Sequence, residues 1–208
     1  WPDSDGHSNY SKNPLTLIPK KSVDLVINLS ASPFYLGKMK SREYVVAKTA
    51  QYFKAPAVYV NLVGAQDEVI YDGASFLMTE KGKKVFSCES FQEDFNVFDL
   101  ETLEAWSSAR KLTSIETLRR SLVLGIQDFC HKTGLEKIHL GLSGGIDSAV
   151  VACLAADALG PKNVVAIAIP GPFSEGISLS LAETLSQNLK IHFLKIQMQS
   201  IYESILVE

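Results

Sequence analysis

The segment "LGLSGGIDSAVV", residues 140–151, decides how this 208-residue chain is interpreted. It joins an apolar run to an Ala-rich stretch, and this order predicts a strand, a glycine-rich turn and a helix. Gly144 and Gly145 would let the backbone turn tightly and bring N–H groups close to an anion. The helix beginning near Asp147 would add its positive N-terminal end. The segment has no lysine, so it is not the common G-x-x-x-x-G-K-[ST] phosphate loop.

The carboxylate of Asp147 narrows the chemistry of this loop. It would repel a bare anion, but it is well placed if a divalent cation lies between it and phosphate groups. Ser143 and Ser148 would supply hydroxyl donors to the same ligand. A magnesium–pyrophosphate complex therefore explains these residue types together. The alternative is an ordinary strand-to-helix turn in which Ser143 caps the helix.

The sequence around the loop alternates between strand and helix patterns. Residues 114–134 predict a helix with Ser114 as a possible N-cap, and Gly134 would end it. Strands are predicted at 137–142, 163–169 and 191–196, and helices at 147–159 and 176–189. This order predicts a parallel α/β sheet with right-handed crossovers, in which ligands bind beyond the carboxyl ends of the strands.

The first hundred residues have a different pattern. Buried strands are predicted at 23–30 and 57–64, on either side of a helix over 36–55 with Tyr44, Ala47 and Gln51 along one face. Hairpin strands should follow, with turns at Asp72–Gly73 and around Gly82. The acidic stretch 89–113 is interpreted as a solvated or interdomain surface. We therefore expect a first domain at 1–100, a linker at 101–113 and a second domain at 114–208.

Composition excludes several other classes. The formal net charge is −3, so no nucleic acid partner is expected, and no apolar run is long enough to span a bilayer. The three cysteines, Cys88, Cys130 and Cys153, are interpreted as reduced core thiols of a cytoplasmic protein. His7 lies in a polar loop with Asp3 and Asp5, a metal-binding pattern that no apolar residues frame, and His131 and His192 lack partners at metal-ligand spacing. The chain begins at Trp1 and ends in a helical pattern, and we interpret it as part of a longer protein.

The loop resembles the pyrophosphate-binding loop of the ATP pyrophosphatases. Among these, "GLSGGIDSA", preceded by "FCHKTGLEKIHL", is most similar to the NAD synthetases. The resemblance implies a doubly wound parallel sheet of the adenine nucleotide alpha hydrolase-like type. It also implies ATP and Mg²⁺ as cofactors, with Asp147 as the metal ligand. The residues it assigns to ATP binding are Gly141, Leu142, Ser143, Gly144, Gly145, Ile146, Asp147 and Ser148.

A second segment supports the same family but departs from its pattern. "VVAIAIPGPFSEGISLSLAETLSQNL" resembles the stretch that meets the nucleotide, where the family has Met-Pro-Ser and later Asp-Ala. This chain has Ile169-Pro170-Gly171-Pro172 and Leu181-Ala182 at those places. The departure implies either a divergent adenine contact or a different substrate preference. The alternative is a Pro/Gly loop with a helix N-cap at Ser174 or Ser178.

Residues in the first hundred resemble the nitrilase-type glutaminase half of glutamine-dependent NAD synthetases, in "NLSASPF…GK…R" and "NLVGAQDE…YDGASF". The resemblance implies the C-terminal part of a nitrilase-like α-β-β-α sandwich. It assigns Ser32 and Lys38 to glutamine binding; otherwise Ser32 would be a strand-end cap and Lys38 a solvated lysine. Trp1 is similar to the end of the family's Cys-Glu-Asp-x-Trp stretch. The glutaminase Cys, Glu and Lys are therefore expected outside this chain.

Together these resemblances imply a ligase that amidates deamido-NAD to NAD. Its substrates would be ATP, deamido-NAD and glutamine or ammonia, with an adenylated intermediate and release of AMP and pyrophosphate. A homo-oligomer is expected, with no membrane partner. Two alternatives stay open: another ATP-pyrophosphatase ligase or thiolase with a different acceptor, or a degenerate binding module.

Overall fold

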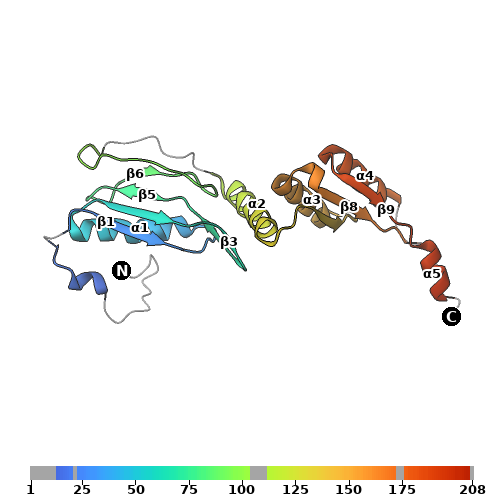
Figure 1. Cartoon of the computed structure of the whole chain (residues 1–208), viewed down its shortest axis with the longest axis horizontal. Helices are drawn as coiled ribbons and strands as arrows, with labels where there is room; N and C mark the ends of the chain where they lie inside the picture. Colours follow the sequence, from blue (N-terminus) through green and yellow to red (C-terminus); the bar gives the residue numbers. More distant parts are fainter. Residues whose placement is uncertain (1–12, 21–22, 104–111, 172–175, 207–208) are drawn as a thin grey trace. The chain divides into compact units, whose positions relative to one another are not determined.

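The computed structural model describes residues 13–20, 23–103, 112–171 and 176–206 (Figure 1). The contacts divide the chain into two compact units, Trp1–Ser121 and Leu122–Glu208. This division falls eight residues after the end of the predicted linker, inside a helix. Most of the linker and His7 lie outside the described residues. The partition into 1–100, 101–113 and 114–208 therefore stays a prediction.

The first unit is built on a four-stranded sheet with the order β1-β2-β5-β6. Its strands are β1 (Val26–Ser30), β2 (Ala57–Asn61), β5 (Phe76–Met78) and β6 (Lys84–Ser87). β1 and β2 are parallel, and the other pairs are antiparallel. A separate hairpin consists of β3 (Val63–Gln66) and β4 (Val69–Asp72). A short 3₁₀ helix, η1 (Pro14–Leu17), precedes the sheet and is capped by the Asn13 side chain.

Helix α1 (Lys38–Phe53) packs on one face of this sheet. Val46 and Ala50 of the helix contact a cluster that contains Tyr59 and Phe76, whose rings stack 5.0 Å apart. The helix ends at Phe53, and its C-cap residue Lys54 has φ +55° and lies two residues before Pro56. Its buried face differs from the one that the sequence singled out. The buried residues are Arg42, Val46, Thr49, Ala50 and Phe53.

Three further expectations for this unit need correction. Within the described residues β1 lies at the edge of the sheet and is not buried as predicted, since Ile27 and Leu29 are 62% and 77% exposed on the face that α1 does not cover. The strand predicted at 57–64 stops at Asn61. The β3–β4 turn lies at Asp67, where φ is +50°, and Asp72–Gly73 instead connects β4 to β5. The turn around Gly82 is confirmed between β5 and β6.

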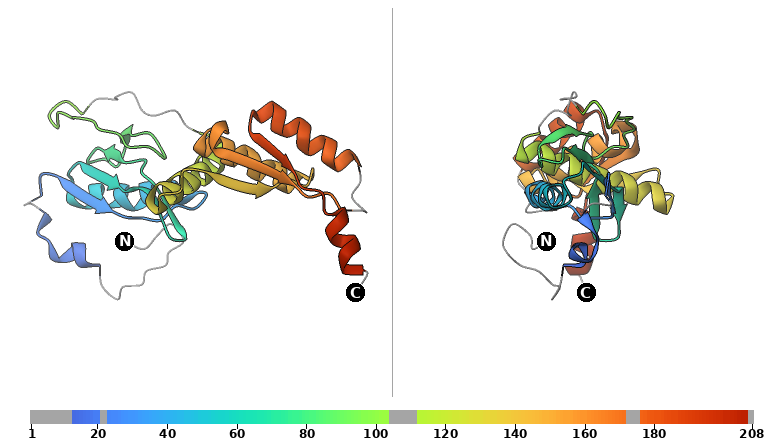
Figure 2. Two further views of the ribbon diagram at one scale, coloured as in Figure 1. Left: turned by 45° about the vertical axis from the view of Figure 1, so that its right-hand side comes forward. Right: turned by 90° about the vertical axis from the view of Figure 1, so that its left-hand side faces the viewer.

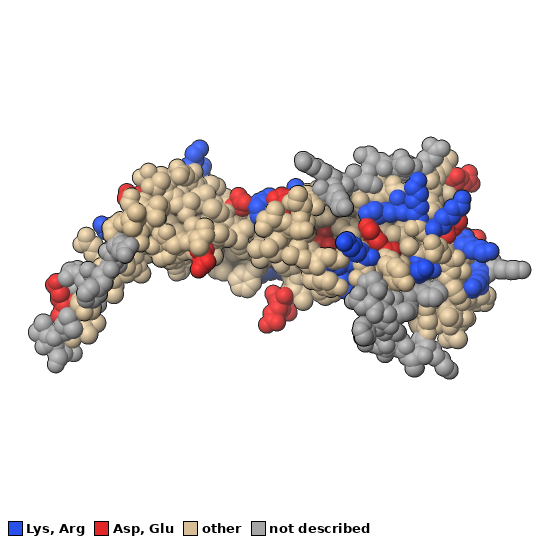
Figure 3. All heavy atoms as spheres, turned by 180° about the vertical axis from the view of Figure 1, so that it is seen from behind, with Lys and Arg blue, Asp and Glu red and all other residues tan. Residues whose placement is uncertain are grey.

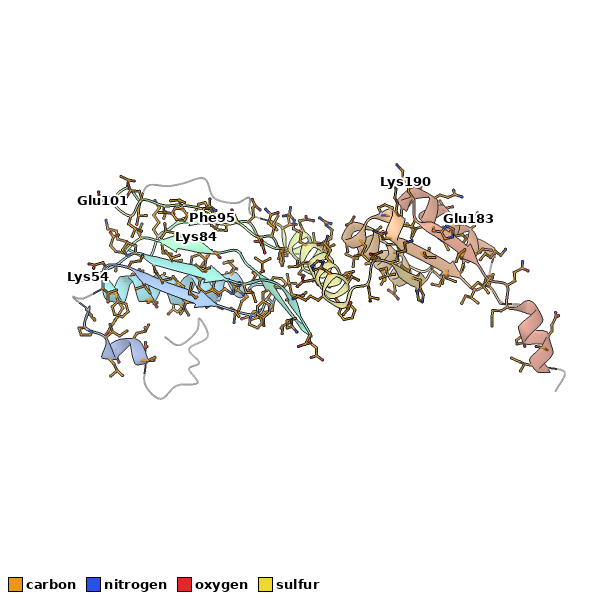
Figure 4. All side chains as sticks on the ribbon, viewed as in Figure 1. Lys54, Lys84, Phe95, Glu101, Glu183 and Lys190 are labelled. Atoms are coloured by element: carbon orange, nitrogen blue, oxygen red, sulfur yellow. The ribbon has the colours of Figure 1, made fainter. Side chains whose placement is uncertain are left out.

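The described part of the acidic stretch that follows β6 is mostly exposed, which agrees with the solvated one of the two predicted roles. The described residues 88–103 form no helix or strand, and Phe95 is 89% exposed (Figure 4). Phe98 instead packs against Phe86 with ring centroids 4.8 Å apart, so it helps to cover the second face of the sheet. Lys and Arg side chains gather over this unit in the view of Figure 3, with acidic side chains between them.

The N-cap of helix α2 (Ser114–Thr133) lies one residue earlier than predicted. The Thr113 side-chain Oγ accepts a hydrogen bond from the Glu116 N–H at 3.3 Å, and the Thr113 carbonyl accepts from Thr117. Thr113 is therefore the N-cap, and Ser114 is the first helical residue. The sequence Thr-x-x-Glu is a capping-box pattern, which explains why Thr113 is preferred.

The carboxylate of Glu116 gives a testable dependence of stability on pH. Hydrogen bonds from Arg119 and Arg120 lower the pKa of Glu116 from 4.5 to about 2. A carboxylate whose pKa is lowered by folding stabilises the folded state above its unfolded pKa and loses this effect as the pH falls. We expect Glu116→Gln to lower the melting temperature above pH 5, with the difference from the parent shrinking towards pH 2.

The control for this experiment is Glu183→Gln, an exposed glutamate of another helix (Figure 4). Melting curves of both variants and the parent at pH 7, 4 and 2 would decide the matter. A Glu116→Gln difference that is constant across this range would contradict the assigned ion pairs. Because these pairs are on the surface, added salt should also shrink the difference.

The second unit contains a three-stranded parallel sheet with the order β7-β8-β9. Its elements are β7 (Ile138–Gly141), α3 (Ile146–Leu159), η3 (Pro161–Asn163), β8 (Val164–Ala168), α4 (Gly176–Leu189), β9 (His192–Lys195) and α5 (Gln199–Leu206). The predicted parallel α/β order is therefore confirmed. α3 and α4 pack side by side on the same face of the sheet (Figure 2).

Small residues allow this close helix-on-sheet packing. Ala152, Ala155 and Ala156 of α3 and Ala182 of α4 are buried against Val164 and Ala166 of β8. Burying such apolar surface contributes roughly 25 cal/mol for each Å² removed from water. Among the three cysteines, all free, Cys130 is buried as predicted, but Cys153 of α3 is exposed and is not a core thiol. None of the described helices is long and apolar enough to cross a membrane.

Candidate functional site

The loop between β7 and α3 has a defined internal structure. Leu142 is 2% exposed and anchors the loop in the core, while its N–H bonds the Ile167 carbonyl at 2.9 Å. The Ser143 and Ser148 hydroxyls lie 3.0 Å apart, and Ser148 also donates to the Gly145 carbonyl. Gly145 is the N-cap residue of α3, with no side chain to occupy the helix terminus. The alternative in which Ser143 is the N-cap is therefore wrong, although Ser143 Oγ accepts from the Gly145 N–H at 3.3 Å.

Gly144 brings this loop against the first turn of α4. Its φ is +82°, a left-handed conformation that favours glycine. A Cβ at this position would overlap the backbone of Ser178, coming within 2.8 Å of its Cα. No side chain can therefore be added without moving the loop or the helix. Ser178 is a third-position residue of α4, which begins at Gly176, so it is not the N-cap of that helix.

A cavity of 190 Å³ opens beside the loop, at the carboxyl ends of β7 and β8. It is lined by Leu142, Ser143, Ala168, Ile169, Pro170, Ser178 and Leu179. Ile169 and Pro170, where the sequence departs from the family pattern, thus border the cavity, whereas Pro172 and Ser174 lie outside the described residues. The sequence missed Ala168 and Leu179. Both could have been predicted, because the carboxyl end of a parallel strand and the start of the following helix border the same crevice.

Asp147 is exposed in the first turn of α3, beside this loop. No group of three or more His, Cys, Asp or Glu residues able to hold a metal occurs among the described residues. A single carboxylate with nearby hydroxyls fits Mg²⁺, because this ion keeps several waters and is usually held by one or two carboxylates together with substrate phosphates. The donor set at Asp147 is therefore compatible with a nucleotide-bound magnesium ion.

The other two predicted site residues lie in the first unit, one between β1 and α1 and one at the start of α1. Ser32 is half-buried, and its N–H donates to the Asn61 side chain at 2.9 Å. Lys38 is the first residue of α1 and is also half-buried, with its Nζ 4.8 Å from the centre of the Tyr35 ring. Lys38 is thus only partly exposed and contacts the Tyr35 ring, and its assignment to glutamine binding stays a prediction.

A larger cavity of 520 Å³ in the first unit is lined by Ala31 and Asn61 among others, and Cys88 is one of its lining residues. Burial, together with the nearby Asp94 carboxylate, raises the pKa of the Cys88 thiol. A raised pKa reduces the thiolate that nucleophilic catalysis requires. This agrees with the expectation that Cys88 is not a glutaminase nucleophile.

The geometry of the second unit indicates the general class to which the protein belongs. A parallel sheet whose first loop is glycine-rich, meets a helix N-terminus and borders a cavity is a nucleotide-binding α/β arrangement. Comparison with known proteins then gives the family. Residues 118–207 match the family model described as NAD synthase.

Relatives with a known description agree over most of the chain. It is 41% identical over 189 residues to a glutamine-dependent NAD(+) synthetase of Synechocystis sp. The aligned residues make up 88% of this chain and 34% of that protein. The corresponding protein of Aquifex aeolicus is 34% identical, with coverage of 87% and 38%. The chain thus spans about a third of the length of the curated relatives it matches.

A solved structure is also similar to this chain over most of its length. The glutamine-dependent NAD+ synthetase from Acinetobacter baumannii, in complex with adenosine diphosphate, has a TM-score of 0.83 and 33% identity. The match covers 89% of this chain and 36% of that one. The predicted resemblance is confirmed: the chain is a relative of the glutamine-dependent NAD(+) synthetases along most of its length.

Proposed function

We propose that this chain contributes the ATP-binding loop of a ligase that converts deamido-NAD to NAD with glutamine-derived ammonia. The observation that carries the proposal is the Ser-Gly-Gly-x-Asp-Ser loop after β7, held by Gly144 against α4 beside a 190 Å³ cavity. Backbone N–H groups of such a loop and the N-terminus of α3 would bind the pyrophosphate part of ATP. The assigned ATP-binding residues are 141–148.

The proposed reaction begins with adenylation of the deamido-NAD carboxylate. The carboxylate oxygen would attack the α-phosphorus of ATP, and pyrophosphate would leave. Ammonia would then attack the activated carbonyl carbon, and AMP would leave as the amide forms. Ser143 and Ser148 would orient the pyrophosphate oxygens, and Asp147 would hold Mg²⁺, which supplies charge neutralisation when it is bound. Preorganised donors around developing charge are the usual source of such catalysis.

The first unit is proposed to be the C-terminal part of a nitrilase-like α-β-β-α glutaminase domain. The second unit would be the start of a doubly wound adenine nucleotide alpha hydrolase-like domain. The β1-β2-β5-β6 sheet with α1 on one face and the parallel β7-β8-β9 sheet support this arrangement. A cytoplasmic homo-oligomer belongs to the same proposal.

The test is an assay of the full-length gene product with deamido-NAD, ATP and MgCl₂. Ammonium chloride and glutamine would be supplied in separate reactions, and NAD and AMP would be measured. We expect NAD and AMP in equal amounts from both nitrogen sources. AMP formation that depends on a different carboxylate would favour another ATP-pyrophosphatase ligase. No AMP with any acceptor would overturn the proposal and favour a non-catalytic module.

Lys38 provides a prediction for the glutamine half alone. An ammonium group at the start of α1 could pair with the α-carboxylate of glutamine, and charge-assisted hydrogen bonds are about twice as strong as neutral ones. Lys38→Gln should therefore raise the KM for glutamine about tenfold or more, the scale expected for loss of one such contact. The rate with ammonium should stay unchanged. Lys48→Gln, on the same helix, is the control.

An equal loss of activity with both nitrogen sources would contradict this role for Lys38. An unchanged KM for glutamine would contradict it as well, and would instead favour the interpretation of Lys38 as a structural residue at the start of the helix.

A further inference from the structure

A buried ion pair lies directly behind Ser32. The Arg42 guanidinium and the Asp72 carboxylate have side chains only 3% and 7% exposed, and Arg42 Nη1 lies 2.7 and 2.9 Å from the two carboxylate oxygens. Arg42 comes from the second turn of α1, and Asp72 is the last residue of β4. Removing two charges from water is costly, and well-packed apolar residues often stabilise a core as well or better. The pair therefore needs an explanation other than stability.

The remaining donors of this network converge on Ser32. Arg42 Nη2 donates to the Ser32 carbonyl at 2.7 Å, and Arg42 Nε donates to Ser32 Oγ at 3.2 Å. From the other side, the Asn61 side-chain oxygen accepts from the Ser32 N–H at 2.9 Å, and the Asn61 Nδ2 donates to Asp72 at 3.2 Å. The N–H, the carbonyl and the hydroxyl oxygen of Ser32 are thus all fixed by two side chains from other elements.

This network acts on an otherwise irregular segment. Residues 31–35 between β1 and α1 belong to no helix or strand. The Phe34 N–H bonds the Ile70 carbonyl at 2.7 Å, and Arg42 Nη2 also reaches the Pro33 carbonyl at 3.3 Å. A loop that carries a binding residue gains precision only when such contacts lock its backbone.

The direction of these hydrogen bonds determines what the Ser32 hydroxyl can do. Ser32 Oγ accepts from Arg42 Nε, and its O–H proton has no acceptor among the residues that the structure describes, so that proton can be donated to a ligand. The charge of Arg42 is compensated by Asp72, so Arg42 does not itself offer an unpaired cation to that ligand. Any carboxylate charge would then be met by Lys38, six residues further along the chain.

We propose that Arg42 and Asn61 are positioning residues for the glutamine site. They hold Ser32 so that its hydroxyl donates to the bound amino acid, while Asp72 keeps the Arg42 fork in the required orientation. The inference rests on the proposed glutamine-dependent function and deepens it. It concerns residues that touch Ser32 and not glutamine itself.

Arg42→Lys in the full-length protein is the first test. A lysine would keep a cation opposite Asp72 but could not bond Ser32 Oγ, Ser32 O and both carboxylate oxygens at once, because it lacks the planar fork. We expect the KM for glutamine to rise about tenfold, with kcat and the ammonium-dependent rate within about twofold of the parent. Arg120→Lys, which changes a half-buried arginine of α2 in the same way, is the matched control.

Asn61→Ala is the second variant, and it leaves the Arg42–Asp72 pair in place. It should also raise the KM for glutamine, because the Ser32 N–H loses its acceptor. A double-mutant cycle gives the decisive readout: in a Ser32→Ala background, neither Arg42→Lys nor Asn61→Ala should change the KM for glutamine further. Coupling of this kind is not expected from a change in folded fraction, which lowers kcat and leaves the KM unaltered.

Unchanged KM values with a lower kcat in both variants would show a purely structural role and would overturn the inference. Full additivity with Ser32→Ala would overturn it too. Failure of the underlying proposal is seen separately, because the parent protein would then form no NAD from glutamine.

Discussion

Replacing Asp147 by Asn should lower NAD and AMP formation at least 100-fold, and equally with ammonium and with glutamine. Asp147 is exposed in the first turn of α3, so the change creates no cavity. Its cost to stability is limited to the loss of a negative charge near a helix N-terminus, typically about 0.3–1 kcal/mol. The catalytic cost is far larger, since removal of one group that meets developing charge commonly costs about 10²–10³-fold in kcat.

The matched control is Asp157→Asn, which removes a carboxylate from an exposed position of the same helix. It should leave both rates within about twofold of the parent, as expected for a surface substitution away from the site. Raised MgCl₂ should partly restore the Asp147→Asn variant if the lost group is a metal ligand. AMP formation by Asp147→Asn at the parent rate would exclude this residue from the ATP site.

The second unit could be predicted from the sequence in more detail than the first. Strand β7, the loop and helix α3 have strong local signals, namely an apolar run, two adjacent glycines and an Ala-rich stretch. A parallel arrangement of the strands then follows, because strands that alternate with single helices through short connections run in the same direction. The contact between Gly144 and Ser178 could not be predicted, because it joins residues 34 positions apart through tertiary packing.

The first unit shows where local patterns are insufficient. Ile27 and Leu29 are part of an apolar β-branched run, which looks the same in a central and an edge strand. In α1, the buried face includes Arg42 and Thr49 as well as apolar residues, and the periodicity of apolar residues does not reveal these polar members. Arg42 is 30 residues from Asp72, so its partner depends on the pairing of β1 with β2 and on the β3–β4 hairpin.

Replacing Gly144 by Ala should also remove ATP-dependent activity, but by a route that Asp147→Asn does not share. The new Cβ would overlap the Ser178 backbone, and it would do so on a residue with φ +82°. A left-handed non-glycine residue costs about 1–2 kcal/mol, and overpacking adds typically 1–3 kcal/mol. The loop or the first turn of α4 must move, and a displacement of about 1 Å near reacting groups can cost about 100-fold in rate.

Gly160→Ala separates the two costs of this change. Gly160, the residue after α3, has φ +80° but nothing within 4 Å of an added Cβ, so it carries the backbone strain without the overlap. We expect Gly160→Ala to lower the melting temperature slightly and to keep the parent rate with both nitrogen sources. Gly144→Ala should lower the melting temperature more and reduce AMP formation at least 100-fold, a loss that the strain at Gly160 cannot reproduce. If Gly144→Ala instead matched Gly160→Ala in both measurements, the loop would not lie against α4 in the working enzyme, and the ATP site would have to be placed elsewhere.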